Sequence, residues 1–172
     1  MAMASCDVNG SSNSTPDILF VTIPIVNKTD TLNGYSTDDA SVKRLDTIQV
    51  GDTVTFRILF WGFSNNLSIC DIIQSDTSAA KFLFPADISL DSVFISSASD
   101  YANGKFVFKN KVQSLYFPFK YVAKKASTDA RISFFLSSDA DFSSSSSLGN
   151  NSFSFILKTP IRLVKPLMNH KH

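Results

Sequence analysis

The chain has 172 residues, of which 44% are hydrophobic, and its 16 Lys and Arg nearly balance 15 acidic residues. This length suits one domain, and the near-zero net charge provides no strong field for DNA or RNA, so nucleic acid is not an expected partner. All the acidic residues are Asp, while Ser, Phe, Val and Ile are abundant. Because this composition lacks good helix formers and favours strands and turns, it predicts an all-β protein.

The first distinctive residue is Cys6, which follows Ala4 and Ser5 and precedes a polar run from Val8 to Thr15. Small residues before a cysteine, with a polar segment behind it, resemble the cleavage point of a bacterial lipoprotein. The resemblance implies lipid (palmitate) on Cys6 and a flexible tether over residues 1–16. It also implies a domain anchored in the outer membrane of the cell envelope, periplasmic or surface-exposed. The signal peptide that such a protein needs would stand upstream of Cys6.

Alternating apolar residues between turn signals predict eight or nine short strands. The clearest is 53–60, where Val54, Phe56, Ile58 and Phe60 share one face. Residues 87–103 fit either a short helix or an irregular crossing between sheets. Pro118 is expected at an edge or a bulge, because proline cannot donate to a sheet ladder. The other expected strands are 18–23, 47–50, 67–74, 80–84, 105–108, 112–122, 130–137 and 152–157, the last with an open continuation past Pro160 to 164.

These strands predict a two-sheet sandwich over residues 17–165, with a closed barrel as the alternative. The serine tract 143–147 is expected to be the solvated tip of a long hairpin, and residues 166–172 a loose C-terminal tail. Cys70, between Ile69 and Ile72, is expected to be a small buried hydrophobe rather than a reactive thiol.

The segment Asp46-Thr47-Ile48-Gln49-Val50-Gly51-Asp52-Thr53-Val54-Thr55-Phe56 resembles the opening strands of immunoglobulin-like domains in bacterial extracytoplasmic proteins. In those domains a Val-Gly-Asp-x-Val turn joins two strands. Together with Ser5-Cys6-Asp7, the chain resembles a Bacteroidota-type lipoprotein with a single immunoglobulin-like domain of uncharacterised function. The resemblance implies a fold and a location, and it brings no catalytic apparatus. The chain lacks the pair of core cysteines that bridges the sheets of antibody-type domains.

Catalytic machinery is not expected. Both histidines, His170 and His172, fall at the end of the chain, where no rigid frame would hold a general base. The neighbouring Asp pairs are read as turn-forming residues, because Asp bonds readily to its own backbone. These pairs are Asp71 and Asp76, Asp87 and Asp91, and Asp139 and Asp141.

Two candidate sites remain. Asp139 and Asp141 offer oxygen ligands at alternate loop positions, which suits calcium, the only candidate cofactor. Trp61 and Phe63 would face away from the core if Val54 to Phe60 face inward, and exposed aromatics could stack on a sugar or anchor a protein contact. We therefore expect a non-catalytic, lipid-anchored binding or structural module with a protein or glycan partner. The alternatives are a fimbrial or adhesin subunit, or an Asp-based or calcium-dependent glycan-active enzyme.

Overall fold

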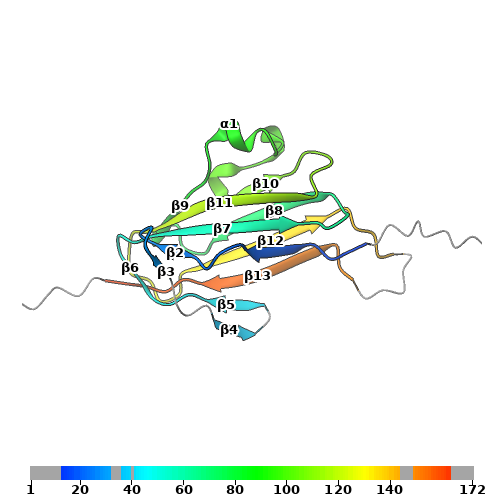
Figure 1. Cartoon of the computed structure of the whole chain (residues 1–172). Coiled ribbons are helices and arrows are strands. Elements are labelled where there is room, and N and C mark those ends of the chain that lie inside the picture. Colours follow the sequence, from blue (N-terminus) through cyan, green and yellow to red (C-terminus); the bar gives the residue numbers. More distant parts are fainter. Residues whose placement is uncertain (1–12, 32–35, 40, 144–148, 164–172) are drawn as a thin grey trace, which may run out of the picture.

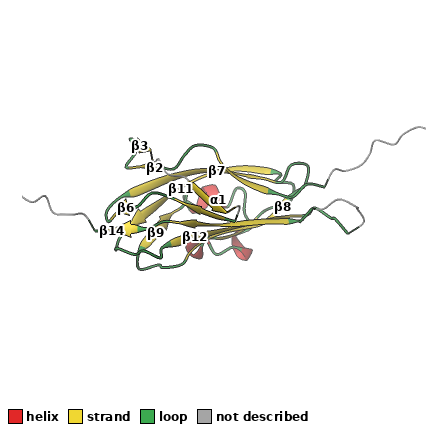
Figure 2. Ribbon diagram, turned by 90° about the horizontal axis from the view of Figure 1, so that it is seen from below, coloured by secondary structure: helices red, strands yellow, loops and turns green. Residues whose placement is uncertain are grey.

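The computed structural model describes residues 13–31, 36–39, 41–143 and 149–163. In this part of the chain strands dominate, and they form two large sheets packed face to face (Figure 1). Figure 2, seen from below, shows the two sheets as separate layers. The fold is therefore an all-β, immunoglobulin-like sandwich, which confirms the expected class and decides against the closed barrel.

The first sheet has six strands in the order β3-β2-β7-β11-β9, with β1 also paired to β7. All its pairings are antiparallel. Its strands are β1 (Asp17–Phe20), β2 (Ile25–Val26), β3 (Asp30–Thr31), β7 (Thr53–Trp61), β9 (Ala80–Leu83) and β11 (Ser114–Ala123).

The second sheet also has six strands, in the order β10-β8-β12-β13-β5-β4, and here β5 runs parallel to β13. A third, parallel pair joins β6 (Ile48–Gln49) to β14 (Ile161–Arg162). The chain thus turns at Pro160 to pair with a different strand instead of prolonging β13. The second sheet consists of β4 (Ser36–Asp39), β5 (Val42–Arg44), β8 (Leu67–Gln74), β10 (Lys105–Val107), β12 (Arg131–Ser138) and β13 (Ser152–Lys158).

The segment between β9 and β10 combines both structures that the sequence allowed. It begins with the short helix α1 (Asp87–Leu90) and continues through the 3₁₀ turns η1 (Ser96–Ala98) and η2 (Tyr101–Asn103). The segment crosses from one sheet to the other, and α1 projects beside the sandwich (Figure 1). Phe94 lies within this crossing and packs on the rings of Phe106 and Phe117, which ties the crossing to the core.

The alternation predicted for β7 is confirmed, because Val54, Phe56, Ile58 and Phe60 are all fully buried. Aromatic rings from both sheets meet in this core. The Phe119 ring of the first sheet has its centroid 6.4 Å from that of Phe134 in the second sheet, and the Phe20 centroid lies 6.1 Å from the same ring. Truncating a fully buried Phe to Ala typically costs about 3–5 kcal/mol, so these rings account for a large part of what holds the sheets together.

Pro118 occupies an edge position, as expected. It lies opposite Arg57 in the ladder between β11 and β7. The Arg57 carbonyl accepts a hydrogen bond from Val21 N–H on its other side (2.9 Å), so the Arg57–Pro118 pair exchanges no ladder bonds. The proline nitrogen therefore points toward the side where β9 has already ended at Leu83. Because no ladder bond is due from the nitrogen of residue 118, the missing N–H of proline costs the sheet no hydrogen bond.

The other strand predictions hold with shifted ends. The first strand, expected over 18–23, ends at Phe20, and residues 21–22 form a bend before Pro24. The Gly51-Asp52 turn is confirmed: Gly51 has a φ of +96° and Asp52 N–H donates to Gln49 O at 3.0 Å. Cys6, residues 1–12 of the tether, serines 144–147 and the 166–172 tail lie outside the described residues.

Candidate functional site

The outer face of the first sheet carries a patch of apolar side chains across β1, β7 and β11. The register of the three antiparallel strands places nine residues in three adjacent rows. We call these nine residues the outer-face patch: Asp17, Trp61 and Ser114 in the first row, Leu19, Leu59 and Tyr116 in the second, and Val21, Arg57 and Pro118 in the third.

Four large apolar side chains of this patch remain open to solvent: Leu19 is 37% exposed, Val21 53%, Trp61 38% and Tyr116 49%. They come from three different strands, so the exposure belongs to a continuous surface and not to one stray residue. Soluble monomers rarely keep a large contiguous apolar surface without a use for it. The outer-face patch is therefore the strongest candidate for a contact surface.

Trp61 and Phe63 form a stacked pair at one end of the patch, with centroids 3.9 Å apart and an interplanar angle of 28°. The pair depends on an unusual backbone, because Phe63 has a φ of +58°, a conformation that bulky residues rarely adopt. The surrounding turn is closed by a bond from Asn65 N–H to Gly62 O (2.9 Å). The turn thus holds Phe63 against Trp61 and makes the indole a rigid element of the surface.

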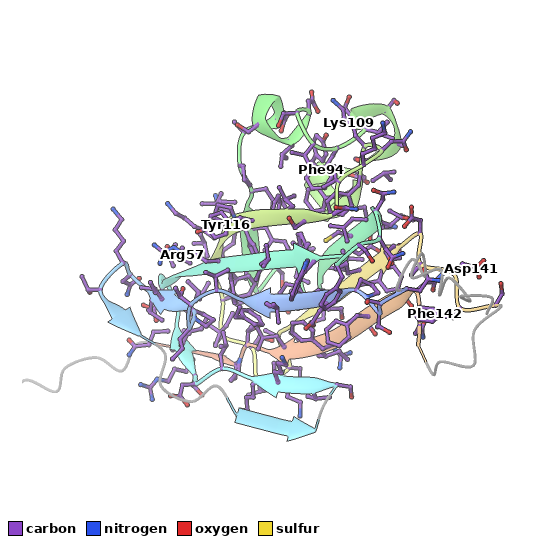
Figure 3. The ribbon with its side chains drawn as sticks, turned by 45° about the vertical axis from the view of Figure 1, so that its right-hand side comes forward. Arg57, Phe94, Lys109, Tyr116, Asp141 and Phe142 are labelled. Atoms are coloured by element: carbon purple, nitrogen blue, oxygen red, sulfur yellow. The ribbon has the colours of Figure 1, made fainter. Side chains whose placement is uncertain are left out.

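Polar groups lie beside the apolar ones. Arg57 occupies the third row between Val21 and Pro118, and Figure 3 labels it together with Tyr116 from the neighbouring strand. Asp17 is next to Trp61 in the first row. Trp, Tyr and Arg are the residue types most often found to dominate binding energy at protein interfaces. The outer-face patch contains one of each.

Loops from four parts of the chain gather at the Trp61 end of the sandwich. Asn13 anchors the incoming chain there: its side-chain carbonyl accepts from Asn65 Nδ2 (3.1 Å) and from Asp141 N–H (3.2 Å). Thr15 Oγ1 accepts from Asn150 N–H at 3.0 Å. Residues 13–16, which the sequence placed in the tether, therefore lie against the domain. The chain that leads back to Cys6 leaves from the same end as the aromatic pair.

The two candidate calcium ligands are both engaged locally. The Asp139 carboxylate accepts from Asn66 N–H and from Asn66 Nδ2, each at 2.7 Å. The Asp141 carboxylate accepts from Ser143 N–H at 2.8 Å. Hydrogen bonding with the Ser143 side chain, and then with this N–H, lowers the pKa of Asp141. No group of three or more His, Cys, Asp or Glu side chains gathers within the described residues. Calcium binding by Asp139 and Asp141 stays a prediction.

Of the other two Asp pairs, Asp76 shows the turn-forming behaviour that the sequence suggested, whereas Asp71 lies within the strand β8, against that expectation. Asp76 accepts from Ser78 Oγ (2.6 Å) and from the N–H groups of Ser78 and Ala79, and the Ser78 bonds lower its pKa. Asp91 accepts from Tyr101 Oη at 2.8 Å. Burial raises the pKa of Tyr101 to about 12, and the hydrogen bond to Asp91 and the charge of that carboxylate act in the same direction. By contrast, burial raises the pKa of Asp71, which lies opposite Lys105 in the sheet.

Cys70 is a free, fully buried thiol on β8, as expected. Burial raises the pKa of its thiol well above the usual value, and the neighbouring Asp71 raises it further. A thiol held in its protonated form is a poor nucleophile. Cys70 therefore acts as a core residue.

Sequence reasoning found Trp61 and Phe63 but missed Leu19, Tyr116 and Arg57. The sequence did carry a signal for Tyr116, because Leu115, Phe117, Phe119 and Tyr121 alternate along the expected strand 112–122 and so share the face opposite to it. What was missing was the strand register that places Tyr116 and Leu19 on either side of Leu59. Register between strands that are far apart in the chain cannot be read from alternation alone.

Comparison of this chain with protein-family models, with curated proteins and with solved structures found no match. Of the helices in the described residues, none has the length and apolar character needed to span a bilayer. The fold thus defines the class, an all-β immunoglobulin-like sandwich, and the argument for function depends on the surfaces of this chain.

Proposed function

We propose that this protein is a lipid-anchored, non-catalytic binding module of the bacterial cell envelope, and that the outer-face patch contacts a protein partner. The observation that carries the proposal is the row of Leu19, Leu59 and Tyr116 next to Trp61, in which Leu19, Tyr116 and Trp61 are exposed on three adjacent strands. Protein interfaces combine such an apolar centre with a polar rim and are enriched in Tyr, Trp and Arg.

The shape of the patch favours a protein over a glycan. Small-ligand sites are usually concave, whereas these nine residues lie on the face of a sheet. Aliphatic side chains, Leu19, Leu59 and Val21, make up much of the surface, and they offer little to the hydroxyl groups of a sugar. A flat apolar face of this kind suits a partner surface that can cover it and exclude water.

The proposed anchor is consistent with the position of the patch. Asn13 is fixed to the domain, and it lies seven positions after Cys6 in the chain. A chain of that length reaches at most about 25 Å when fully extended. A lipid on Cys6 would therefore keep the Trp61 end of the sandwich close to the membrane. The partner we propose is accordingly a protein that resides at the same membrane.

Site-specific photo-crosslinking tests the contact surface. A benzophenone amino acid is placed at position 116 in the full-length precursor, and for the matched control at position 73. Ile73 is 37% exposed on the second sheet, against 49% for Tyr116, and so samples an accessible position on another face. We expect a discrete protein adduct from position 116 and none from position 73. The same adducts from both positions, or none from 116, would contradict the proposed surface.

Membrane fractionation tests the anchor separately. Cys6→Ala in the full-length precursor should move the protein from the membrane to the soluble fraction and abolish palmitate labelling, because the thiol that carries the lipid is gone. The melting temperature of the purified domain should stay unchanged, since the core residues of the described part of the chain all lie between Ile18 and Ile161. The anchor proposal fails if the unmutated precursor never partitions into membranes.

A further inference from the structure

The second sheet brings three cationic side chains into one row on its outer face. Arg131 on β12 lies directly opposite Lys158 on β13, and Lys158 lies directly opposite Arg44 on β5. Their chain neighbours Ile132, Leu157 and Lys43 point inward, where Lys43 Nζ lies 4.7 Å from the centre of the Phe155 ring. Arg44, Lys158 and Arg131 therefore all point to the outside, and all three are exposed. We call them the cation row.

Such a row is unfavourable by itself. Residues directly opposite each other in adjacent strands have their Cβ atoms about 4.5–5.5 Å apart, and like charges placed there destabilise a sheet. No side-chain hydrogen bond or ion pair joins the guanidinium of Arg44 or Arg131 to another group in the described part of the chain. The guanidinium N–H donors of Arg44 and Arg131, on either side of Lys158, are thus available to a ligand.

The cation row borders a cavity of about 630 Å³ at one end of the second sheet. Arg131 and Lys158 contribute to its wall, together with three hydroxyl side chains, Ser75, Ser127 and Thr128. The strands that carry the row, β5, β13 and β12, lie side by side in Figure 1. The cavity therefore has one guanidinium fork, one ammonium group and neutral hydroxyl groups around one volume.

Two carboxylates also line this cavity, and one of them already accepts hydrogen bonds within its own turn. Asp76 is held by the Ser78 hydroxyl and by two backbone N–H groups of its own turn, and Lys125 lies near enough to lower its pKa further. Asp129 is exposed. The lining itself carries two cations, Arg131 and Lys158, against these two carboxylates. Two further cations lie next to it, Arg44 beside Lys158 in the sheet and Lys125 near Asp76.

We propose that this cavity binds an oxyanion of the phosphate or sulfate type, held by Arg131, Lys158 and Arg44. The planar guanidinium fork matches the oxygens of phosphate and sulfate, and charge-assisted bonds of this kind are among the strongest hydrogen bonds in proteins. A bound anion would also remove the repulsion within the cation row. The site lies on the second sheet, away from the outer-face patch, and it does not depend on the proposed function.

Thermal melting with added phosphate tests the site. Sodium phosphate is titrated into the purified domain at constant ionic strength, with chloride as the balancing salt. At a phosphate concentration about tenfold above Kd, binding should raise Tm by about 3–6 °C. Arg131→Gln combined with Lys158→Gln should abolish this rise.

The matched control is Lys105→Gln combined with Lys120→Gln, which removes the same charge from exposed strand positions outside the row and should keep the phosphate response.

Vesicles of phosphatidylglycerol distinguish the source of the anion. Vesicle binding that requires Arg131 and Lys158 assigns the site to a lipid headgroup, and a response to inorganic phosphate alone assigns it to a soluble ligand. No rise in Tm with phosphate beyond chloride, or an equal rise in both double variants, would overturn the proposal.

Discussion

Gly104→Ala is expected to destabilise the domain by about 3–5 kcal/mol, in the range that single substitutions seldom reach. Gly104 follows η2 with a φ of +70° and packs directly on β8, where a Cβ would lie 2.0 Å from the Ile72 carbonyl oxygen. That oxygen belongs to the backbone and cannot rotate away. The Ile72 N–H also donates to Gly104 O at 2.8 Å, so relief of the collision would break the bond that fastens the crossing segment to the sheet.

Gly51→Ala is the matched control for this prediction. Gly51 also has a positive φ, +96°, but nothing lies within 4 Å of the position that a Cβ would take. Its replacement should cost only the backbone strain of a left-handed residue, about 1–2 kcal/mol. Urea unfolding of both variants measures the difference between them, which isolates the collision with Ile72. Equal losses of stability would show that Gly104 does not make this close approach.

Trp61→Ala is expected to weaken binding of the protein partner at least about 30-fold, which corresponds to the 2 kcal/mol that defines a binding hot spot. The indole is well placed for this role, because the stacked Phe63 ring holds it in position before the partner arrives. Little ordering entropy then remains to be lost on binding. The measurement is calorimetric titration with the partner found by crosslinking.

Loss of the Trp61 ring should also cost the fold some stability, so affinities are compared at a temperature at which each variant is folded. The ring is 38% exposed, and a stacked aromatic pair contributes about 0.5–1.5 kcal/mol beyond its buried area. Ile73→Ala serves as the control, since it removes a similarly exposed apolar side chain from the second sheet. Affinity that falls equally in Trp61→Ala and Ile73→Ala would indicate that the outer-face patch is not the contact.

The inward-facing positions of the long strands could be predicted from sequence because they follow a period of two. Val54 to Phe60 illustrate this: the apolar residues occupy every second position, and all four are buried. Pro118 was likewise placed by a local rule, since a residue without an N–H fits only where no ladder bond is due. Such features depend on a few neighbouring residues, which the sequence displays directly.

Surfaces that cross several strands could not be predicted in the same way. The outer-face patch needs Leu19, Leu59 and Tyr116 in one row, and the cation row needs Arg44, Lys158 and Arg131 in another. Each set joins segments that are distant in the chain, and a register shift of one residue would turn a strand's side chains to the opposite face. The attachment of residues 13–16 through Asn65 and Asp141 was hidden for the same reason, because it depends on loops meeting in space.

The most direct test of the proposed function is purification of the full-length precursor from native membranes, compared with two variants. The unmutated protein and Ile73→Ala should be recovered from the membrane fraction with the same bound partner. Trp61→Ala combined with Tyr116→Ala should be recovered from that fraction in equal amount, folded but without the partner. If the partner remains with this double variant, or if no partner accompanies the unmutated protein, the outer-face patch is not the binding surface of an anchored module.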